Sequence, residues 1–106
     1  MRTAGCTTIP TPVHGAPTSG GGDHLEAALR RFVNGETLSP HDDHAFEEVA
    51  AVLEGEFHVE AAGEVYDLST GEGIVIPPGE PREWRCDGEN GGLLYRVLVR
   101  VPGAPA

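Results

Sequence analysis

Short apolar runs separated by turn residues dominate this sequence from Asn34 onward. The 106 residues include fifteen glycines and nine prolines, many of them placed between the apolar runs. The segment from Glu56 to Ala61 alternates polar and apolar residues, and Pro77 ends the run of Ile74 to Ile76. Strands bounded in this way by Gly and Pro are typical of sandwiches and barrels. The spacing predicts an all-β fold of roughly seven or eight short strands.

The composition predicts one domain and a narrow set of partners. A chain of 106 residues is long enough for a single modest core. Its formal net charge of -10 argues against nucleic acid and anionic membranes as partners, because both attract Lys and Arg. No run approaches the roughly 20 apolar residues of a membrane span, and no signal-peptide core follows Arg2. Cys6 and Cys86 are the two cysteines, and they lie far apart in the sequence, which is weak evidence for a disulfide. The sequence therefore favours a protein of the reducing cytoplasm.

Two histidines and a carboxylate precede the central apolar run at regular spacing. Gly35 is followed by five residues and then His41, and three residues separate His44 from Glu48. Six residues separate Glu48 from Gly55. Imidazole and carboxylate groups are ligands for Zn, Fe, Mn, Ni and Cu. The segment is therefore a candidate site for a divalent transition metal, and the sequence does not choose among these metals.

A second segment places Gly71, Pro77 and Gly79 at similarly regular positions, with five residues between the first two. Together the two segments resemble the two sequence motifs of the cupin superfamily. Cupins are small β-barrels of the jelly-roll type. The resemblance covers about residues 23–101. It implies that the chain folds as a double-stranded β-helix, or jelly-roll barrel.

The resemblance also suggests how the chain is divided. A single cupin domain is expected over residues 1–106, with an extended N-terminal arm at 1–22, the barrel at 23–101 and a tail at 102–106. Within the barrel, the segment 23–33 fits two secondary structures. The spacing of Leu25, Leu29 and Phe32 favours an amphipathic helix, whereas the resemblance implies a strand. The strand is the prediction.

The first motif departs from the family pattern by one residue. The family has His-x-His, whereas this chain has His41-Asp42-Asp43-His44. Counting from Gly35 selects His41 as the first ligand, and counting back from His44 selects Asp42. Alternate residues of a strand share a face, so His41 and His44 face the same side only across a bulge. Both alternatives stay open, and either one leaves three ligands with Glu48.

The second motif departs more strongly, because Arg82 occupies its histidine position and Cys86 its asparagine position. A guanidinium stays protonated and cannot ligate a metal, so the family's four-ligand site is incomplete. Arg82 either pairs with Glu48 inside a metal-free barrel or holds an anionic group of a substrate. Arg96 and Arg100 share a face of the last strand, and we expect them in solvent or at a subunit contact.

Two functions follow from these residues. The first is a metal-dependent enzyme that acts on a small polar or anionic metabolite, as do the dioxygenases, isomerases, lyases and tailoring enzymes among similar cupins. The residues assigned to it are Glu48 and Arg82 as catalytic groups, Arg82, Trp84 and Tyr95 as substrate contacts, and His41, Asp42, His44 and Glu48 as metal ligands. The alternative is a non-catalytic or metal-free cupin that binds a small ligand or a partner protein. The resemblance implies a homodimer in both cases.

Overall fold

The computed structural model describes residues 5–13, 16–40 and 46–101, which form nine strands and no helix. In chain order the strands are β1 (Thr18–Gly21), β2 (Leu25–Phe32), β3 (Thr37–Leu38), β4 (Phe46–Glu54), β5 (Glu56–Ala61), β6 (Glu64–Ser69), β7 (Gly73–Ile76), β8 (Arg82–Cys86) and β9 (Gly92–Arg100). Within these residues, no helix has the length and apolar character that a membrane span requires.

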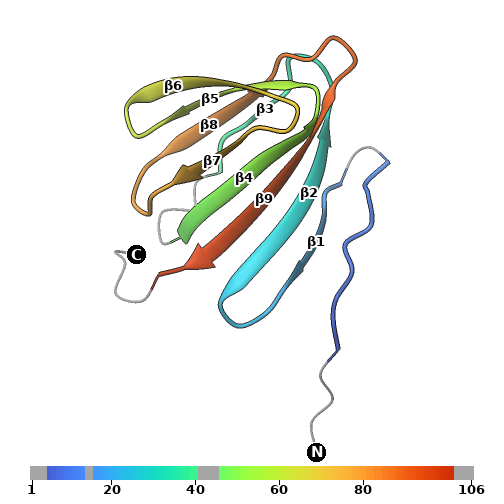
Figure 1. The fold of residues 1–106 in the computed structure, drawn as a ribbon, viewed down its shortest axis with the longest axis vertical. Coiled ribbons are helices and arrows are strands. Elements are labelled where there is room, and N and C mark those ends of the chain that lie inside the picture. The colour runs from blue at the N-terminus through green and yellow to red at the C-terminus, as the bar shows by residue number, and fades with distance from the viewer. Residues whose placement is uncertain (1–4, 14–15, 41–45, 102–106) are drawn as a thin grey trace, which may run out of the picture.

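The strands form two antiparallel sheets that enclose one core. The large sheet has the order β1-β2-β9-β4-β7, and the small sheet has the order β3-β8-β5-β6. Strands far apart in sequence are neighbours in the large sheet, where β9 lies between β2 and β4 (Figure 1). The prediction of an all-β, jelly-roll fold is confirmed.

Strand β2 settles the ambiguity of the segment 23–33. Every residue from Leu25 to Phe32 pairs with a residue of β9, and those from Glu26 to Leu29 also pair with β1. These tertiary pairings outweigh the local helical pattern, which is a weak preference. The pattern looks helical because apolar residues occupy both faces of the strand: Ala27 and Leu29 lie on one face, and Phe32 lies on the other.

The inner faces of the two sheets supply the core. Trp84 and Phe57 are fully buried and meet edge to face, with ring centroids 6.3 Å apart. Cys86 is also fully buried, and burial raises the pKa of its thiol. Both Cys6 and Cys86 are free thiols. The buried core consists of Phe32, Ala50, Val52, Phe57, Val59, Ala61, Ile76, Trp84, Cys86 and Leu94.

The chain passes from the large sheet to the small sheet at Gly55, where space is very limited. Gly55 has a φ of 83°, which favours glycine. A Cβ atom at this position would lie 2.5 Å from the Gly91 carbonyl oxygen. Gly63, in the two-residue hairpin between β5 and β6, also has a positive φ, but a Cβ there would meet nothing within 4 Å. A substitution at Gly63 would therefore cause backbone strain alone, whereas one at Gly55 would cause backbone strain and a steric clash.

We expect Gly55→Ala to destabilise the fold more than Gly63→Ala. Each substitution places an L side chain in the left-handed region, which costs about 1–2 kcal/mol. Gly55→Ala adds overpacking against backbone atoms, which costs roughly a further 1–3 kcal/mol. Urea unfolding followed by tryptophan fluorescence measures both values. Equal unfolding midpoints for the two variants would contradict the packing at Gly55.

Candidate functional site

Glu48 is a fully buried carboxylate in the interior of the barrel. It lies on β4 beside Ile76 of β7 and Leu98 of β9. Along β4 the side chains alternate, so that Glu48 is buried whereas Glu47 and Val49 are exposed. Removing a charged carboxylate from water costs roughly several kcal/mol. Charged or hydrogen-bonding partners must compensate this cost. The structure must therefore provide partners for both oxygens.

Two arginines from different sheets provide those partners. Arg82 Nη1 donates a hydrogen bond to Glu48 Oε1 at 2.8 Å. Arg96 binds both oxygens, with Nε donating to Oε2 at 2.6 Å and Nη2 donating to Oε1 at 3.0 Å. The carboxylate thus accepts three charge-assisted bonds, two of them from one guanidinium. We call Glu48, Arg82 and Arg96 the buried triad.

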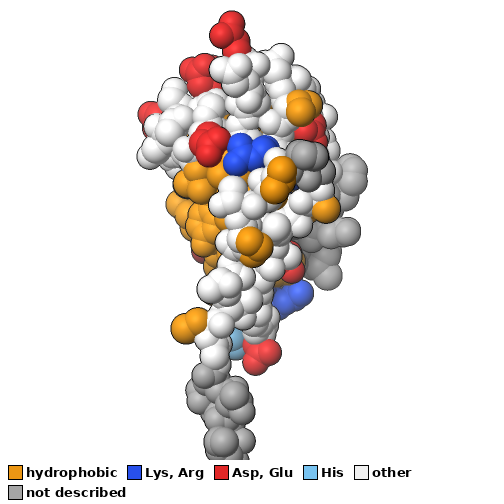
Figure 2. Space-filling view, turned by 90° about the vertical axis from the view of Figure 1, so that its right-hand side faces the viewer, with side chains coloured by type: hydrophobic (Ala, Val, Ile, Leu, Met, Phe, Trp, Pro, Cys, Tyr) orange, Lys and Arg blue, Asp and Glu red, His pale blue; other side chains and the backbone are white. Residues whose placement is uncertain are grey.

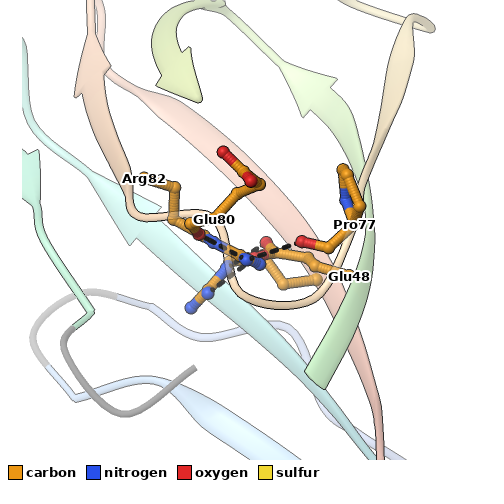
Figure 3. A network of polar contacts seen from close by, with 5 residues as sticks. Glu48, Pro77, Glu80 and Arg82 are labelled. Carbon is orange, nitrogen blue, oxygen red and sulfur yellow. Dashed lines mark hydrogen bonds and ion pairs between the residues drawn. The ribbon is translucent and has the colours of Figure 1, made fainter. Parts of the chain in front are cut away.

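Arg82 also holds the loop between β7 and β8 in place. Its Nη2 donates to the carbonyl oxygen of Glu80 at 2.7 Å and to that of Pro77 at 3.3 Å, and its Nε donates to Glu80 at 3.1 Å. These contacts wrap the loop around the guanidinium (Figure 3). Arg82 is 5% exposed, so the barrel and this loop together enclose its charge. Of the two alternatives that the sequence leaves open for Arg82, the structure contains the ion pair with Glu48.

Arg96 is the residue that the sequence analysis missed. The expectation that it lies in solvent or at a subunit contact is wrong, because its side chain is 11% exposed and reaches Glu48. Arg96 pairs in register with Ala50 of β4, which is a core residue, so it points inward. The sequence carried a usable signal. Leu94 and Leu98 flank Arg96 at even spacing, and both are buried.

The described part of the family's metal site does not fit a divalent cation. Glu48 is the one predicted ligand that the structure describes, and both of its oxygens already accept bonds from guanidinium groups. A divalent cation on Glu48 would lie next to two positive charges in a medium that screens them weakly. Arg82, at the position of the fourth ligand, has no lone pair to offer. The predicted ligands His41, Asp42 and His44 lie outside the described residues.

The two predicted aromatic contacts lie in different places. Trp84 is on the inner face of β8, two residues after Arg82, and is fully buried. Its indole Nε1 has no hydrogen-bond partner within the described residues. Tyr95 pairs with Ala51 and Leu29 on the outer face of the large sheet, opposite to the side of Arg96. The structure therefore places Trp84 in the barrel and does not bring Tyr95 to Glu48.

An open hollow of about 570 Å³ lies beside Arg82, at one end of the small sheet. Three exposed carboxylates line it, from Glu60, Glu64 and Glu83. Ser39 also lines it, and its hydroxyl donates to Glu83 at 3.0 Å. Pro40, Ala61, Val65 and Pro81 line the rest of it, so the hollow is a partly apolar surface that carries acidic side chains next to the buried triad.

A second group of metal-type donors lies on the outer face of the small sheet. The ligand atoms of His58, Asp67 and Asp87 lie within 4.8 Å of one another, and His58 Nδ1 is 2.9 Å from Asp67 Oδ1. Arg85 already binds Asp87 through both carboxylate oxygens, at 2.7 and 3.3 Å. This contact lowers the pKa of Asp87. The group is an alternative set of metal donors for any metal-binding measurement on this protein.

Comparison with known proteins gives a consistent family and fold. Residues 28–97 match the family model described as a cupin domain. The TT1209 protein of Thermus thermophilus has 24% identity and a TM-score of 0.74, over 87% of this chain and 89% of that chain. An RmlC-like cupin from Shewanella frigidimarina has 26% identity and a TM-score of 0.68, over 92% and 86%.

A third similar structure is the cupin domain of Cnp3 from Schizosaccharomyces pombe, with 14% identity and a TM-score of 0.72. The match covers 80% of this chain but 60% of that chain, so the present chain spans less than two thirds of the Cnp3 structure. No curated protein matches the sequence. These structures identify the fold of the chain.

Replacing Glu48 with Gln should destabilise the fold strongly. The substitution keeps the size of the side chain but leaves Arg82 and Arg96 buried without the carboxylate that they share. Breaking a buried ion pair in this way costs about 3–5 kcal/mol. Glu47→Gln is the matched control, because its exposed side chain should change stability by no more than about 0.5 kcal/mol. If both variants unfold at the same urea concentration, the buried triad does not stabilise the barrel.

Proposed function

Since this chain belongs to the cupin family, we propose that it is a small-ligand-binding cupin in which the buried triad occupies the place of a metal centre. The ligand would bind in the hollow beside Arg82, where the barrel meets the β5–β6 hairpin. This proposal follows the metal-free alternative that the sequence leaves open.

The observation that carries the proposal is the state of Glu48. Its two oxygens accept three hydrogen bonds from two arginines, and the side chain has no exposed surface. A carboxylate held in this way is available neither as a metal ligand nor as a proton-transfer group for a substrate. The most economical role for Glu48 is to hold Arg82 and Arg96 inside the barrel, which in turn fixes the loop at Pro77 and Glu80.

The lining of the hollow indicates the class of ligand. Glu60, Glu64 and Glu83 place negative charge around it, while the Arg82 guanidinium is satisfied by Glu48 and by backbone carbonyls. An anionic ligand would be repelled by three carboxylates. A neutral polyhydroxyl compound or a small cation can instead donate hydrogen bonds to them. We therefore favour a neutral or cationic ligand over the anionic metabolite that the sequence suggests.

A metal-dependent enzyme is the second candidate, and the motif spacing favours it. His41, Asp42, His44 and Glu48 follow the first cupin motif closely enough to supply three ligands. This function requires Glu48 to leave at least one arginine when the metal binds. Metal content therefore separates the two candidates directly.

We expect the purified protein to bind no stoichiometric amount of Zn, Fe, Mn, Ni or Cu through Glu48. The measurement is elemental analysis after equilibration with each metal, carried out on Asp67→Asn so that the surface donors near His58 do not contribute. Adding Arg82→His should increase uptake, because it removes one guanidinium and supplies an imidazole. One metal ion per chain that is lost in His44→Ala would overturn the proposal in favour of the enzyme.

Ligand charge gives an independent test of the hollow. We expect neutral sugars or alkylamines, rather than dicarboxylates, to raise the unfolding temperature in a thermal-shift screen, because a ligand that binds the folded state stabilises it. For any amine that is found, Glu64→Arg should weaken binding by about tenfold or more. Glu56→Arg, which changes an exposed carboxylate of β5 that is not among the lining residues, is the control. Stabilisation by dicarboxylates that is indifferent to Glu64→Arg would contradict this assignment.

A further inference from the structure

The outer face of the small sheet carries a histidine and two carboxylates that the buried triad does not use. Strands β6, β5 and β8 lie side by side in this sheet (Figure 1). Phe57 of β5 and Trp84 of β8 point into the core, so the next residues along these strands, His58 and Arg85, point outward. The group therefore lies outside the barrel, on the other face of the sheet from the interior.

The strand register brings these three side chains together. His58 of β5 is the direct partner of Asp67 on β6 and of Arg85 on β8. Asp87 follows β8, and its backbone N–H donates to the Glu56 carbonyl oxygen at 2.8 Å, which holds it beside β5. The ligand atoms of His58, Asp67 and Asp87 lie within 4.8 Å of one another. We call these three residues the outer cluster.

The shortest separation in the outer cluster already suits two ligands of one metal ion. His58 Nδ1 and Asp67 Oδ1 are 2.9 Å apart. Imidazole nitrogen and carboxylate oxygen each lie about 2.0–2.1 Å from a bound ion, so that two of them in neighbouring positions are roughly 3 Å apart. The ion would replace the proton that joins the two atoms. Asp87 completes the set by turning its exposed side chain toward them.

Burial and charge also favour a cation at this place. The His58 side chain is 19% exposed, so the sheet restricts the orientation of its imidazole. Asp67 and Asp87 carry two negative charges, of which the Arg85 ion pair neutralises one. On the side of the molecule that Figure 2 shows, acidic side chains mostly stand apart from one another. The outer cluster thus combines a restricted nitrogen ligand with an excess of negative charge.

The donor set indicates the class of cation. One imidazole nitrogen and two carboxylate oxygens suit divalent transition metals such as Zn²⁺, whereas Mg²⁺ and Ca²⁺ prefer sites made of oxygen alone. Three protein ligands leave at least one coordination position for water. The ion would therefore be held by the outer cluster together with solvent.

Arg85 competes with such an ion for Asp87. Its Nε and Nη2 donate to the two Asp87 carboxylate oxygens at 2.7 and 3.3 Å. The Arg85 side chain is 48% exposed, and an exposed ion pair of this kind is weak. A bound cation can therefore displace the guanidinium into solvent. Arg85 lowers the affinity of the outer cluster without closing it.

We propose that the outer cluster is a surface site for one divalent transition-metal ion of the zinc type, which ties β5 and β6 to the segment after β8. The site uses none of the motif residues His41, His44 and Glu48, and it is independent of the ligand proposed for the hollow. A bound ion should stabilise the folded chain, because the three ligands come together only when the sheet forms.

Titration calorimetry with Zn²⁺ tests the proposal in a His44→Ala background, which removes a predicted ligand of the interior. We expect one Zn²⁺ per chain, bound at least about tenfold more weakly after His58→Ala or Asp67→Asn. His24→Ala and Asp23→Asn are the matched controls, because these exposed residues lie in the turn between β1 and β2. No Zn²⁺ binding in the His44→Ala background would overturn the proposal, and so would binding that His58→Ala leaves intact.

A substitution of Arg85 gives a second test, in which binding should become stronger. Arg85→Gln removes both the competitor for Asp87 and a positive charge beside the ion, so the affinity for Zn²⁺ should rise by about fivefold or more. Arg31→Gln is the matched control, since it changes the net charge equally but breaks an exposed ion pair with Glu54 on the large sheet. An affinity that Arg85→Gln leaves unchanged or lowers would remove Asp87 from the ligand set and overturn the site as proposed.

Discussion

The barrel depends on how one buried negative charge is neutralised. Glu48 has no exposed surface, and an unpaired carboxylate there would be far too costly for a domain of this size. Arg82 comes from the small sheet and Arg96 from the large sheet, so their bonds to Glu48 join the two layers at one point. Arg82 extends the same network into the loop at Pro77 and Glu80. Both sheets and one loop are thus tied to a single carboxylate.

This arrangement inverts the electrostatics of a metal centre. In a metal site, acidic and imidazole groups converge on a bound cation that can polarise a substrate. Here the cations are two side chains fixed to β8 and β9, and the carboxylate supplies the shared ligand atoms. Such a network gives rigidity and specificity of packing. It does not supply a Lewis acid. In the function that we propose, a ligand meets the rim of the barrel, where Glu60 and Glu64 are exposed.

The fold was predictable because its signals are local and repeated, while the site depends on register. Turn residues and short apolar runs predicted the all-β fold, and the family resemblance gave the Glu48–Arg82 ion pair as one of two alternatives for Arg82. The assignment of 23–33 needed the pairing of β2 with β9, which no local pattern contains. Arg96 was missed because its even spacing with Arg100 does not say which face is inside, whereas the apolar Leu94 and Leu98 on the same face do. The carbonyls of Pro77 and Glu80 could not be foreseen, since any residue offers a carbonyl and only the loop conformation aims it.

A single alternation along β4 governs both faces of the large sheet. Glu48, Ala50 and Val52 point inward, so Val49, Ala51 and Leu53 must point outward, because successive side chains of a strand alternate. Moving this register by one residue would place Glu48 in solvent and bury Val49, and Arg82 and Arg96 would lose their shared partner. The buried triad therefore fixes the register, and the register exposes the apolar row through Val75, Val49 and Val97. The exposed apolar row on the outer face is thus a geometric consequence of the charge held within.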